Sequence, residues 1–342
     1  MVYYFTLMTT VITGASGHVG ANIVRALAVQ GKIVRAMIHV DRRAIEGLGI
    51  QTVNGDVLEP ASLDRAFEGA DTVYHLAASI SLADTRRMKT VNAIGTKNIV
   101  EACLRNRVKR LVHFSSIHAV APAPRRNMIN EECALVEPRD CSTYARSKAA
   151  AEEEVHEGLQ RGLNAVIVRP TAMLGPYDYQ PSFFGRLLIG LARGGFPGLV
   201  AGGFDWVDVR DVVDGAIRAE ATAPAGAEYL LSGHWESLRG VAAMVDSVTN
   251  NGIPKLICPV WLAGLGAPLM TVFDRMTKRP PLFTSFSIEA IRSSERVSHQ
   301  KATRELGYQP RPLQRSIEDT LTWFCEAGQL GSSILVGFEK AR

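Results

Sequence analysis

The stretch that decides the fold is TTVITGASGHVG, residues 9–20, in which a short β-rich run leads directly into three regularly spaced glycines. The run Thr9–Thr13 is typical of a buried strand. The residues that follow, 19–30, have the periodicity of a helix, and Gly31 is a typical helix end. The sequence therefore predicts a strand, a tight turn and a helix, which together begin a β-α-β unit.

Each glycine of this turn has a separate role. The first permits the tight turn, the second lets the backbone approach a pyrophosphate, and the third lets the helix pack closely on the sheet. The N–H groups at the start of the helix favour a negatively charged ligand, and a serine hydroxyl adds a further donor. The residues expected to hold a dinucleotide pyrophosphate are Gly14, Ser16, Gly17, His18 and Val19, with Gly20 as the packing glycine.

Strand-like and helix-like segments alternate through the first half of the chain. Further strands are expected at Ile33–Ile38, Gln51–Val53, Asp71–Leu76, Arg110–Ser115 and Ala165–Arg169, and helices at Ala61–Glu68, Val91–Arg107 and Thr143–Gln160. Apolar strands that alternate with helices form a parallel sheet covered on both faces. The predicted fold class is therefore α/β, a Rossmann-type doubly wound parallel sheet.

The pattern loosens after Pro170, where glycines and prolines gather between residues 175 and 203. Trp206–Val213 and Glu228–Leu231 are expected to return to the sheet, and the remainder is mainly helical. This predicts a dinucleotide-binding domain over 8–170, with returns near 204–232. A smaller, mostly helical substrate-binding region is expected over 171–203 and 233–325, followed by a tail over 326–342.

Composition excludes several classes of protein. The net charge is +4 over 342 residues and no long Lys/Arg run occurs, so a nucleic-acid partner has no electrostatic support. The five cysteines are scattered without a CxxC pair, which predicts neither disulfides nor a metal site and favours the cytoplasm. The apolar stretch Leu256–Met270 is too short for a membrane span. It is expected to be a buried helix or lid, with a membrane-surface contact as the alternative.

The end of the second strand bears on the choice of cofactor. NAD-binding proteins usually place a carboxylate there, to accept from the ribose 2′-OH. Here Ile38 is followed by His39, Asp41 and two arginines, Arg42 and Arg43. A 2′-phosphate would meet positive charge through His39 and Arg42, so NADP(H) is favoured and NAD(H) stays possible.

Two later strand ends also predict contacts with the cofactor. Asp56 follows the third strand, where a carboxylate accepts from an adenine amino group and Val57 packs on the ring. The alternative for Asp56 is an ordinary loop residue before a helix. Small residues after the fourth strand let the backbone lie close to a ribose or nicotinamide. They belong to the stretch Leu76, Ala77 and Ala78.

A Tyr-x-x-x-Lys pair supplies candidate proton chemistry. Tyr144 and Lys148 are four residues apart and therefore share one helix face. A free tyrosine is a poor base at neutral pH, and a neighbouring cation lowers its pKa. Ser116, after the fifth strand, can hydrogen-bond the substrate oxygen while Tyr144 exchanges the proton. His118 either lines the same cleft or is structural.

These motifs together resemble the extended short-chain dehydrogenase/reductase family, the NAD-dependent epimerase/dehydratase group, over about residues 9–323. The resemblance implies that Ser116, Tyr144 and Lys148 are catalytic, that Asp56 contacts adenine, and that Asn92 is structural. The segment RPTAMLGP, 169–176, resembles the family's stretch beside the nicotinamide. The other residues expected to bind cofactor are Ser115, Pro170, Thr171 and Ala172. The tail KATRELGYQP, 301–310, resembles dihydroflavonol-4-reductase-like and 3β-hydroxysteroid-dehydrogenase-like members.

The leading hypothesis is an NAD(P)-dependent oxidoreductase acting on a ketone or secondary alcohol of a small, fairly apolar molecule. The first alternative is a nucleotide-sugar epimerase or dehydratase with bound NAD, in which arginines contact a diphosphate. The candidates for that contact are Arg186, Arg193, Arg275 and Arg292. The second alternative is a non-catalytic NADP-binding sensor. The resemblance also implies a homodimer through the helices Val91–Arg107 and Thr143–Gln160.

Overall fold

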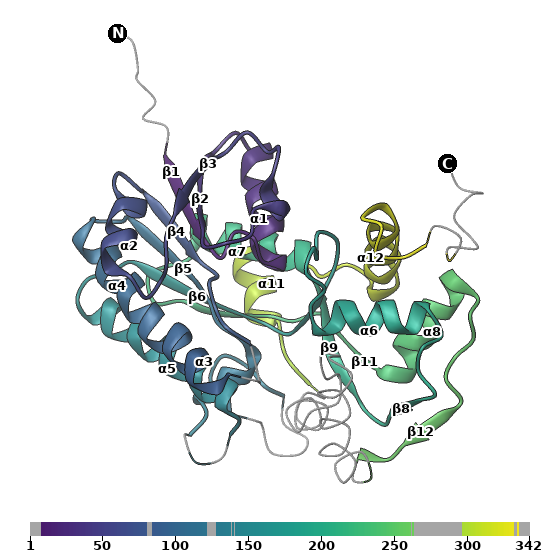
Figure 1. Ribbon diagram of the computed structural model, residues 1–342. Coiled ribbons are helices and arrows are strands. Elements are labelled where there is room, and N and C mark those ends of the chain that lie inside the picture. The colour runs from purple at the N-terminus through teal and green to yellow at the C-terminus, as the bar shows by residue number, and fades with distance from the viewer. Residues whose placement is uncertain are drawn as a thin grey trace.

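The computed structural model describes residues 8–80, 84–121, 128–137, 139, 141–260, 262, 296–331 and 334. A large α/β lobe contains the N-terminal half, and a smaller lobe contains α6 (Phe183–Ala192), α8 (Leu238–Thr249) and α12 (Leu313–Glu326) (Figure 1). Among the described residues, no helix has both the length and the apolar character needed to cross a membrane.

The central sheet has seven strands, all parallel, in the order β10-β6-β5-β4-β1-β2-β3. Their bounds are β1 Thr9–Thr13, β2 Ile33–Ile38, β3 Gln51–Asn54, β4 Thr72–His75, β5 Arg110–Phe114, β6 Ala165–Pro170 and β10 Glu228–Leu231. The strand order reverses between β1 and β4, which is the switch point where ligands of such sheets bind. The predicted fold class is confirmed.

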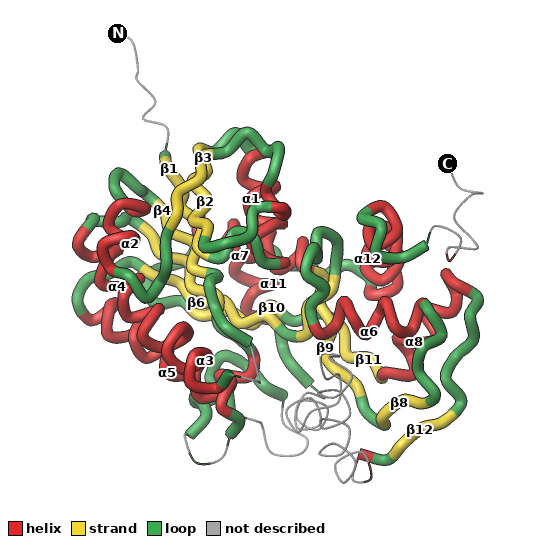
Figure 2. The backbone as a smooth tube through the Cα atoms, viewed as in Figure 1, coloured by secondary structure: helices red, strands yellow, loops and turns green. Residues whose placement is uncertain are grey.

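Helices cover both faces of this sheet (Figure 2). On one face lie α1 His18–Val29, α7 Val209–Thr222 and α11 Gln300–Leu306; on the other lie α2 Pro60–Phe67, α4 Gly95–Arg105 and α5 Thr143–Gln160. Successive strand residues point to opposite faces. Val11 therefore packs with α2, α4 and α5, while Ile12 packs with α1, α7 and α11. Burial on both faces explains why the strands are almost wholly apolar.

The helical run before β5 begins earlier than its expected start at Val91. It consists of α3 Thr85–Lys89, one π-helical turn at Thr90–Ile94, and then α4. Such single-turn π bulges often occur at functional sites. Short 3-10 turns occur at Arg43–Ile45 and Ile117–Ala119.

The smaller lobe has its own sheets and core. A three-stranded sheet has the order β11-β9-β7, and β12 pairs with β8. The bounds are β7 Ala172–Leu174, β8 Gly198–Val200, β9 Gly203–Asp208, β11 His234–Ser237, β12 Leu256–Cys258, α6 Phe183–Ala192, α8 Leu238–Thr249 and α12 Leu313–Glu326. Its apolar core includes Leu188, Trp206 and Phe324, and is separate from the two cores of the central sheet.

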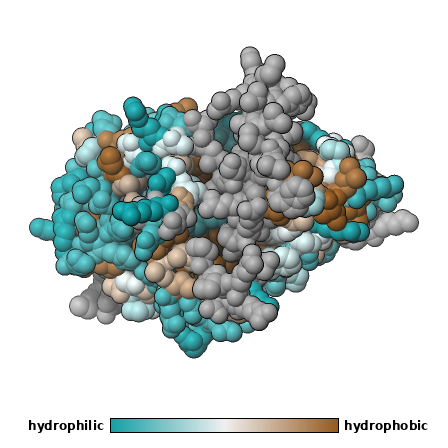
Figure 3. All heavy atoms as spheres, turned by 90° about the horizontal axis from the view of Figure 1, so that it is seen from below, coloured by the Kyte–Doolittle hydropathy of each residue, from teal (hydrophilic) through white to brown (hydrophobic). Residues whose placement is uncertain are grey.

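One sequence prediction for this region was wrong, and another is tested only at its start. Trp206–Val213 does not return to the central sheet: β9 belongs to the small sheet and ends at Asp208, whose side chain accepts from Arg210 N and caps α7. Of the stretch Leu256–Met270, expected to be a buried helix or lid, the structure describes strand β12, in which Leu256 is 67% exposed, and helical residues at Val260 and Leu262. Apolar surface is visible on the side where β12 lies (Figure 3). Residues 261 and 263–270 lie outside the described part.

Candidate active site

The glycine turn joins β1 to α1 at the switch point. Gly14 has φ +71°, and Gly17 N donates to Gly14 O at 3.0 Å. A Cβ on Gly14 would lie 2.7 Å from Ala77 N, and one on Gly20 would lie 2.2 Å from Gly14 O. A Cβ on Gly17 would meet only Gly14 O, at 3.4 Å. The fold itself therefore requires two of the glycines, whereas Gly17 leaves its backbone open to a ligand.

Side chains around the turn are engaged in holding it. The Ser16 hydroxyl donates to the backbone carbonyl of Asp41, and the His18 ring lies 3.2 and 3.1 Å from the carbonyls of Gly175 and Pro176. Gly17 caps α1 without a side-chain bond. What these residues offer an anion is therefore the backbone N–H groups at the start of α1, where the helix dipole favours negative charge.

At the ends of β2 and β3, charged side chains lie at the surface. The His39 ring is 3.4 Å from the Asp56 carboxylate, and Arg42 donates to the Asn54 side chain at 3.2 Å. Asp41 accepts from Arg43 and Gln180, which hold the pKa of its carboxyl well below its usual range. The one carboxylate that follows Ile38 is thus neutralised by Arg43.

The segments after β3 and β4 are fixed by buried contacts. Val57 is buried under Gly95, where an added Cβ would lie 2.8 Å from Val57 Cγ2. Asn92, in the π-helical turn, accepts from Ser79 N at 2.7 Å and donates to the Ser79 carbonyl and the Ser147 hydroxyl. Asn92 therefore fixes the chain beyond Leu76, Ala77 and Ala78 and joins it to α5.

The residues predicted to transfer a proton, Ser116, Tyr144 and Lys148, come together from the end of β5 and from α5. Ser142 caps α5 by accepting from Ala145 N, so that Tyr144 lies in its first turn. A side-chain hydrogen bond joins Tyr144 to Ser116. The buried Lys148 ammonium donates to the Phe114 carbonyl at 2.8 Å. All three predicted residues therefore lie at the carboxyl end of one strand.

Burial governs the acidity of this group. It raises the pKa of Tyr144, against the opposing bond from Ser116, and it lowers the pKa of Lys148 to about 8. The pKa of Tyr144 is thus raised overall, opposite to the lowering predicted from the neighbouring Lys148, because burial has the largest effect on it.

The remaining predicted cofactor contacts lie at the ends of β5 and β6. The Ser115 hydroxyl is buried and has no hydrogen-bond partner among the described residues. A buried polar group without a partner costs free energy, which a ligand can recover. Thr171, by contrast, donates to Asp205, which also accepts from Gly233 N. Pro170 is the last residue of β6, which pairs with β10. Ala172 is the first residue of β7, which pairs with β9.

Comparison with known proteins agrees with this geometry. The model of the NAD dependent epimerase/dehydratase family matches residues 10–231, which include the glycine turn, Ser116, Tyr144 and Lys148. The chain belongs to this family. Membership confirms the resemblance to extended short-chain dehydrogenases/reductases and makes the protein an NAD(P)-dependent oxidoreductase by type.

Individual relatives cover nearly the whole of this family member. Sterol demethylase protein B of Methylococcus capsulatus is 35% identical over 94% of this chain and 100% of its own length. A dihydroflavonol 4-reductase candidate of Synechocystis sp. is 30% identical over 93% of this chain and 94% of its own length. Among solved structures, that of gox2253 superposes with a TM-score of 0.83 at 28% identity, covering 94% of this chain and 99% of that one.

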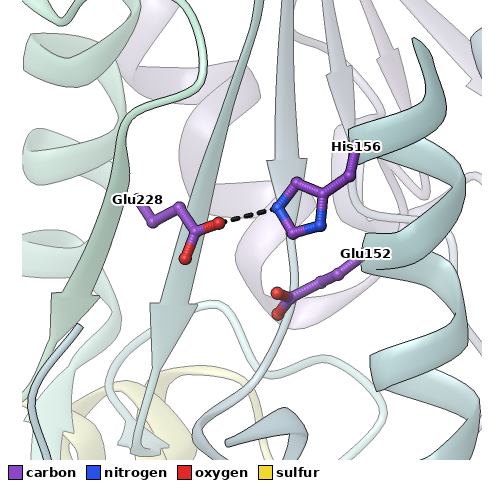
Figure 4. A group of neighbouring side chains, drawn as sticks. All are labelled: Glu152, His156 and Glu228. Carbon is purple, nitrogen blue, oxygen red and sulfur yellow. Dashed lines mark hydrogen bonds and ion pairs between the residues drawn. The ribbon is translucent and has the colours of Figure 1, made fainter. Parts of the chain in front are cut away.

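One partly buried polar cluster of this epimerase/dehydratase-family protein was not anticipated. Glu152 and His156 on α5 approach Glu228 on β10 closely enough to suggest a metal site (Figure 4). The guanidinium of Arg169, however, lies 2.6 Å from Glu152 and 2.5 Å from Glu228, and His156 is 2.7 Å from Glu228. A buried arginine therefore already supplies the positive charge. Sequence reasoning missed the cluster because Glu228 is distant along the chain.

Proposed function

We propose that the protein transfers a hydride between a nicotinamide cofactor and a ketone or secondary alcohol on a small, fairly apolar molecule, with Tyr144 as acid and base. The observation that carries the proposal is the hydrogen bond between Tyr144 and Ser116, with Lys148 one helical turn behind. Two hydroxyl groups beside one another can bind one carbonyl oxygen, and the tyrosine can give it a proton.

The residues present fit a dinucleotide. Gly17 leaves the backbone open for a pyrophosphate, and the buried Ser115 hydroxyl at the strand end has no partner in the part of the chain that the structure describes. When bound, the nicotinamide supplies or accepts the hydride. Lys148 has three N–H donors for ribose hydroxyls and, when protonated, favours the phenolate form of Tyr144. Ser116 orients the substrate oxygen toward the tyrosine.

NADP(H) is the proposed cofactor. His39 and Arg42 lie at the ends of β2 and β3, where a 2′-phosphate would approach, and Asp41 is neutralised by Arg43. An arginine fork matches the geometry of a phosphate. A cytoplasmic homodimer through α4 and α5 is part of the same proposal.

The alternative, a nucleotide-sugar epimerase, requires cations for a diphosphate. Arg186 donates to the Pro181 carbonyl and Arg193 to the Gln329 carbonyl. Arg275 and Arg292 lie outside the described residues. Similarity to a sterol demethylase protein and a dihydroflavonol 4-reductase candidate supports a substrate with an apolar skeleton.

The test is cofactor oxidation with a panel of apolar ketones, beside an assay of UDP-sugar interconversion. We expect NADPH consumption with ketones and none with UDP-sugars. Tyr144→Phe should lower kcat by about 10²–10⁴-fold because the proton donor is lost. Tyr179→Phe, which removes a hydroxyl that accepts from Arg25, is the matched control and should leave kcat unchanged. UDP-sugar interconversion without net cofactor turnover would establish the epimerase. If Tyr144→Phe is as active as Tyr179→Phe, Tyr144 is not the proton donor, which would support the sensor.

A further inference from the structure

His75 is the last residue of β4, and its buried ring bonds a hydroxyl group on each side. Its Nδ1 lies 2.9 Å from Thr13 Oγ1, and its Nε2 lies 3.0 Å from Thr96 Oγ1. Thr13 ends β1 directly before Gly14, and Thr96 lies in the first turn of α4. One imidazole therefore joins the glycine turn to the helix on the neighbouring face of the sheet.

The direction of each of these hydrogen bonds follows from its surroundings. The Thr96 hydroxyl donates its one proton to the Asn92 carbonyl at 2.6 Å, so its oxygen accepts from Nε2–H of His75. Burial lowers the pKa of His75 to about 3, so the ring is neutral at pH 7 and Nδ1 carries no proton. Nδ1 therefore accepts from the Thr13 hydroxyl, whose oxygen accepts from Ala77 N at 3.3 Å.

The same series of bonds continues from the π-helical turn to α5. Asn92 Nδ2 donates to Ser147 Oγ at 2.9 Å, and Ser147 Oγ donates to the Tyr144 carbonyl at 2.7 Å. We call this series the His75 network. Every side chain in it is buried: Thr13, His75, Thr96, Asn92 and Ser147. At one end it holds Ala77 N against the glycine turn, and at the other it reaches the backbone of Tyr144.

We propose that His75 is a positioning residue, whose two hydrogen bonds fix the glycine turn relative to α5 and thereby align the nicotinamide with Tyr144. The inference rests on the proposed function, in which a hydride reaches the carbonyl carbon and a proton from Tyr144 reaches its oxygen. A displacement of about 1 Å between reacting groups can cost about a hundred-fold in rate. Loss of the His75 bonds should therefore slow hydride transfer more than it weakens cofactor binding.

The first experiment removes the two hydroxyl groups separately and together. Thr13→Val and Thr96→Val keep the side-chain shape, and each should lower the single-turnover rate of NADPH oxidation about five-fold, the value of one hydrogen bond. Independent sites would give about twenty-five-fold in the double variant. Because either substitution already breaks the connection through His75, we expect the double variant to lose less than about ten-fold. The Kd of NADPH should stay within about two-fold of the wild type.

The second experiment uses a neighbouring histidine as the matched control. The ring of His113 on β5 is also buried and lies 5.3 Å from that of His75 between centroids, but neither of its nitrogens has a hydrogen-bond partner among the described residues. We expect His75→Phe to lower the single-turnover rate at least about ten-fold, and His113→Phe to lower it less than about two-fold.

A third variant separates alignment from stability. His75→Phe leaves two buried hydroxyls unpaired, which destabilises the fold. Combining it with Thr13→Val and Thr96→Val replaces all three partners by apolar groups, and this triple variant should regain stability in denaturant unfolding but not the rate of hydride transfer. If the triple variant regains both, the network serves stability alone and the proposal is overturned.

The remaining outcomes distinguish failure of this inference from failure of the proposed function. Multiplied effects of the two valine substitutions, or equal losses in His75→Phe and His113→Phe, overturn the role of His75 while leaving the oxidoreductase intact. A Kd of NADPH that rises as much as the rate falls would show a role in binding rather than in alignment, and would also overturn it. If the wild-type protein transfers no hydride between a nicotinamide cofactor and any ketone or alcohol, the proposed function fails, and the inference fails with it.

Discussion

The glycine turn and the proton-transfer group lie at neighbouring strand ends but are built in different ways. The turn is made by backbone, within a few residues of chain, and its requirements are steric: Gly14 and Gly20 leave no room for a Cβ. The proton-transfer group is made by side chains from β5 and α5, and its requirements are chemical: burial, charge and hydrogen bonds set the pKa values of Tyr144 and Lys148. Substitutions should therefore damage cofactor binding in the first region and catalysis in the second.

The largest effect is expected at Gly14, where steric contact alone determines whether a side chain can be accommodated. Gly14 and Gly31 have nearly the same φ, +71° and +73°, but a Cβ on Gly31 would meet nothing within 4 Å. Both alanine variants incur backbone strain of about 1 kcal/mol, and only Gly14→Ala adds a collision with Ala77 N, of about 2 kcal/mol or more. Denaturant unfolding and the Kd of NADPH should both show this difference.

Gly31→Ala is thus the matched control for Gly14→Ala. We expect its Kd for NADPH to stay within about two-fold of the wild type, since an exposed helix end is far from the ligand. If the two variants lose stability and affinity equally, backbone strain rather than the contact with β4 governs the turn, and the steric side of the comparison is wrong.

A smaller effect is expected at Glu152, whose substitution should change both the stability of the fold and the pKa of Lys148. This buried carboxylate bonds Arg169 and raises the pKa of Lys148, one helical turn away. Breaking a buried ion pair usually costs about 3–5 kcal/mol, but Glu228 still pairs with Arg169, so Glu152→Gln should cost about 2 kcal/mol. Glu153→Gln, on the exposed side of the same helix, should cost less than about 0.5 kcal/mol.

The pH profile separates the electrostatic role of Glu152 from simple packing. Lys148 is charged below its pKa of about 8 and neutral above it, so steps that need the cation weaken as pH rises through that value. Removing the Glu152 charge lowers this pKa, and the alkaline limb of kcat/KM should therefore move to lower pH. A loss of stability without movement of that limb would confine Glu152 to holding α5 against β6.

The same contrast explains what the sequence could predict. Thr9–Thr13, Ile33–Ile38 and Thr143–Gln160 have the predicted bounds because local pattern, glycine ends and a serine cap determine them. The end of β9 was missed, since apolar periodicity alone does not show that Asp208 turns inward as a cap.

Local sequence patterns could not predict contacts between segments that are distant along the chain. The bonds of His18 to Gly175 and Pro176, and those of Arg169 to Glu152 and Glu228, depend on how the sheet brings the segments together. The sequence identified Ser116, Tyr144 and Lys148 as a set through their spacing and the family resemblance. It gave no sign that Lys148 donates to the Phe114 carbonyl, because every backbone carbonyl looks the same in a sequence.

The smallest expected effect tests the proposed selection of NADPH by charged side chains beside the glycine turn. Arg42 donates to Asn54 at the end of β3, whereas Arg43 is paired with Asp41. If Arg42 faces the 2′-phosphate, Arg42→Ala should raise the Kd of NADPH about ten-fold, equivalent to about 1.4 kcal/mol, and leave that of NADH unchanged. Arg43→Ala removes the cation paired with Asp41, whose carboxylate still accepts from Gln180, and should weaken NADPH less, through repulsion alone. Two results would contradict this prediction: equal Kd values for NADPH and NADH in the wild type, or an equal change of both Kd values in Arg42→Ala. Either would show that Arg42 does not contact the 2′-phosphate and that the glycine turn binds both cofactors equally well.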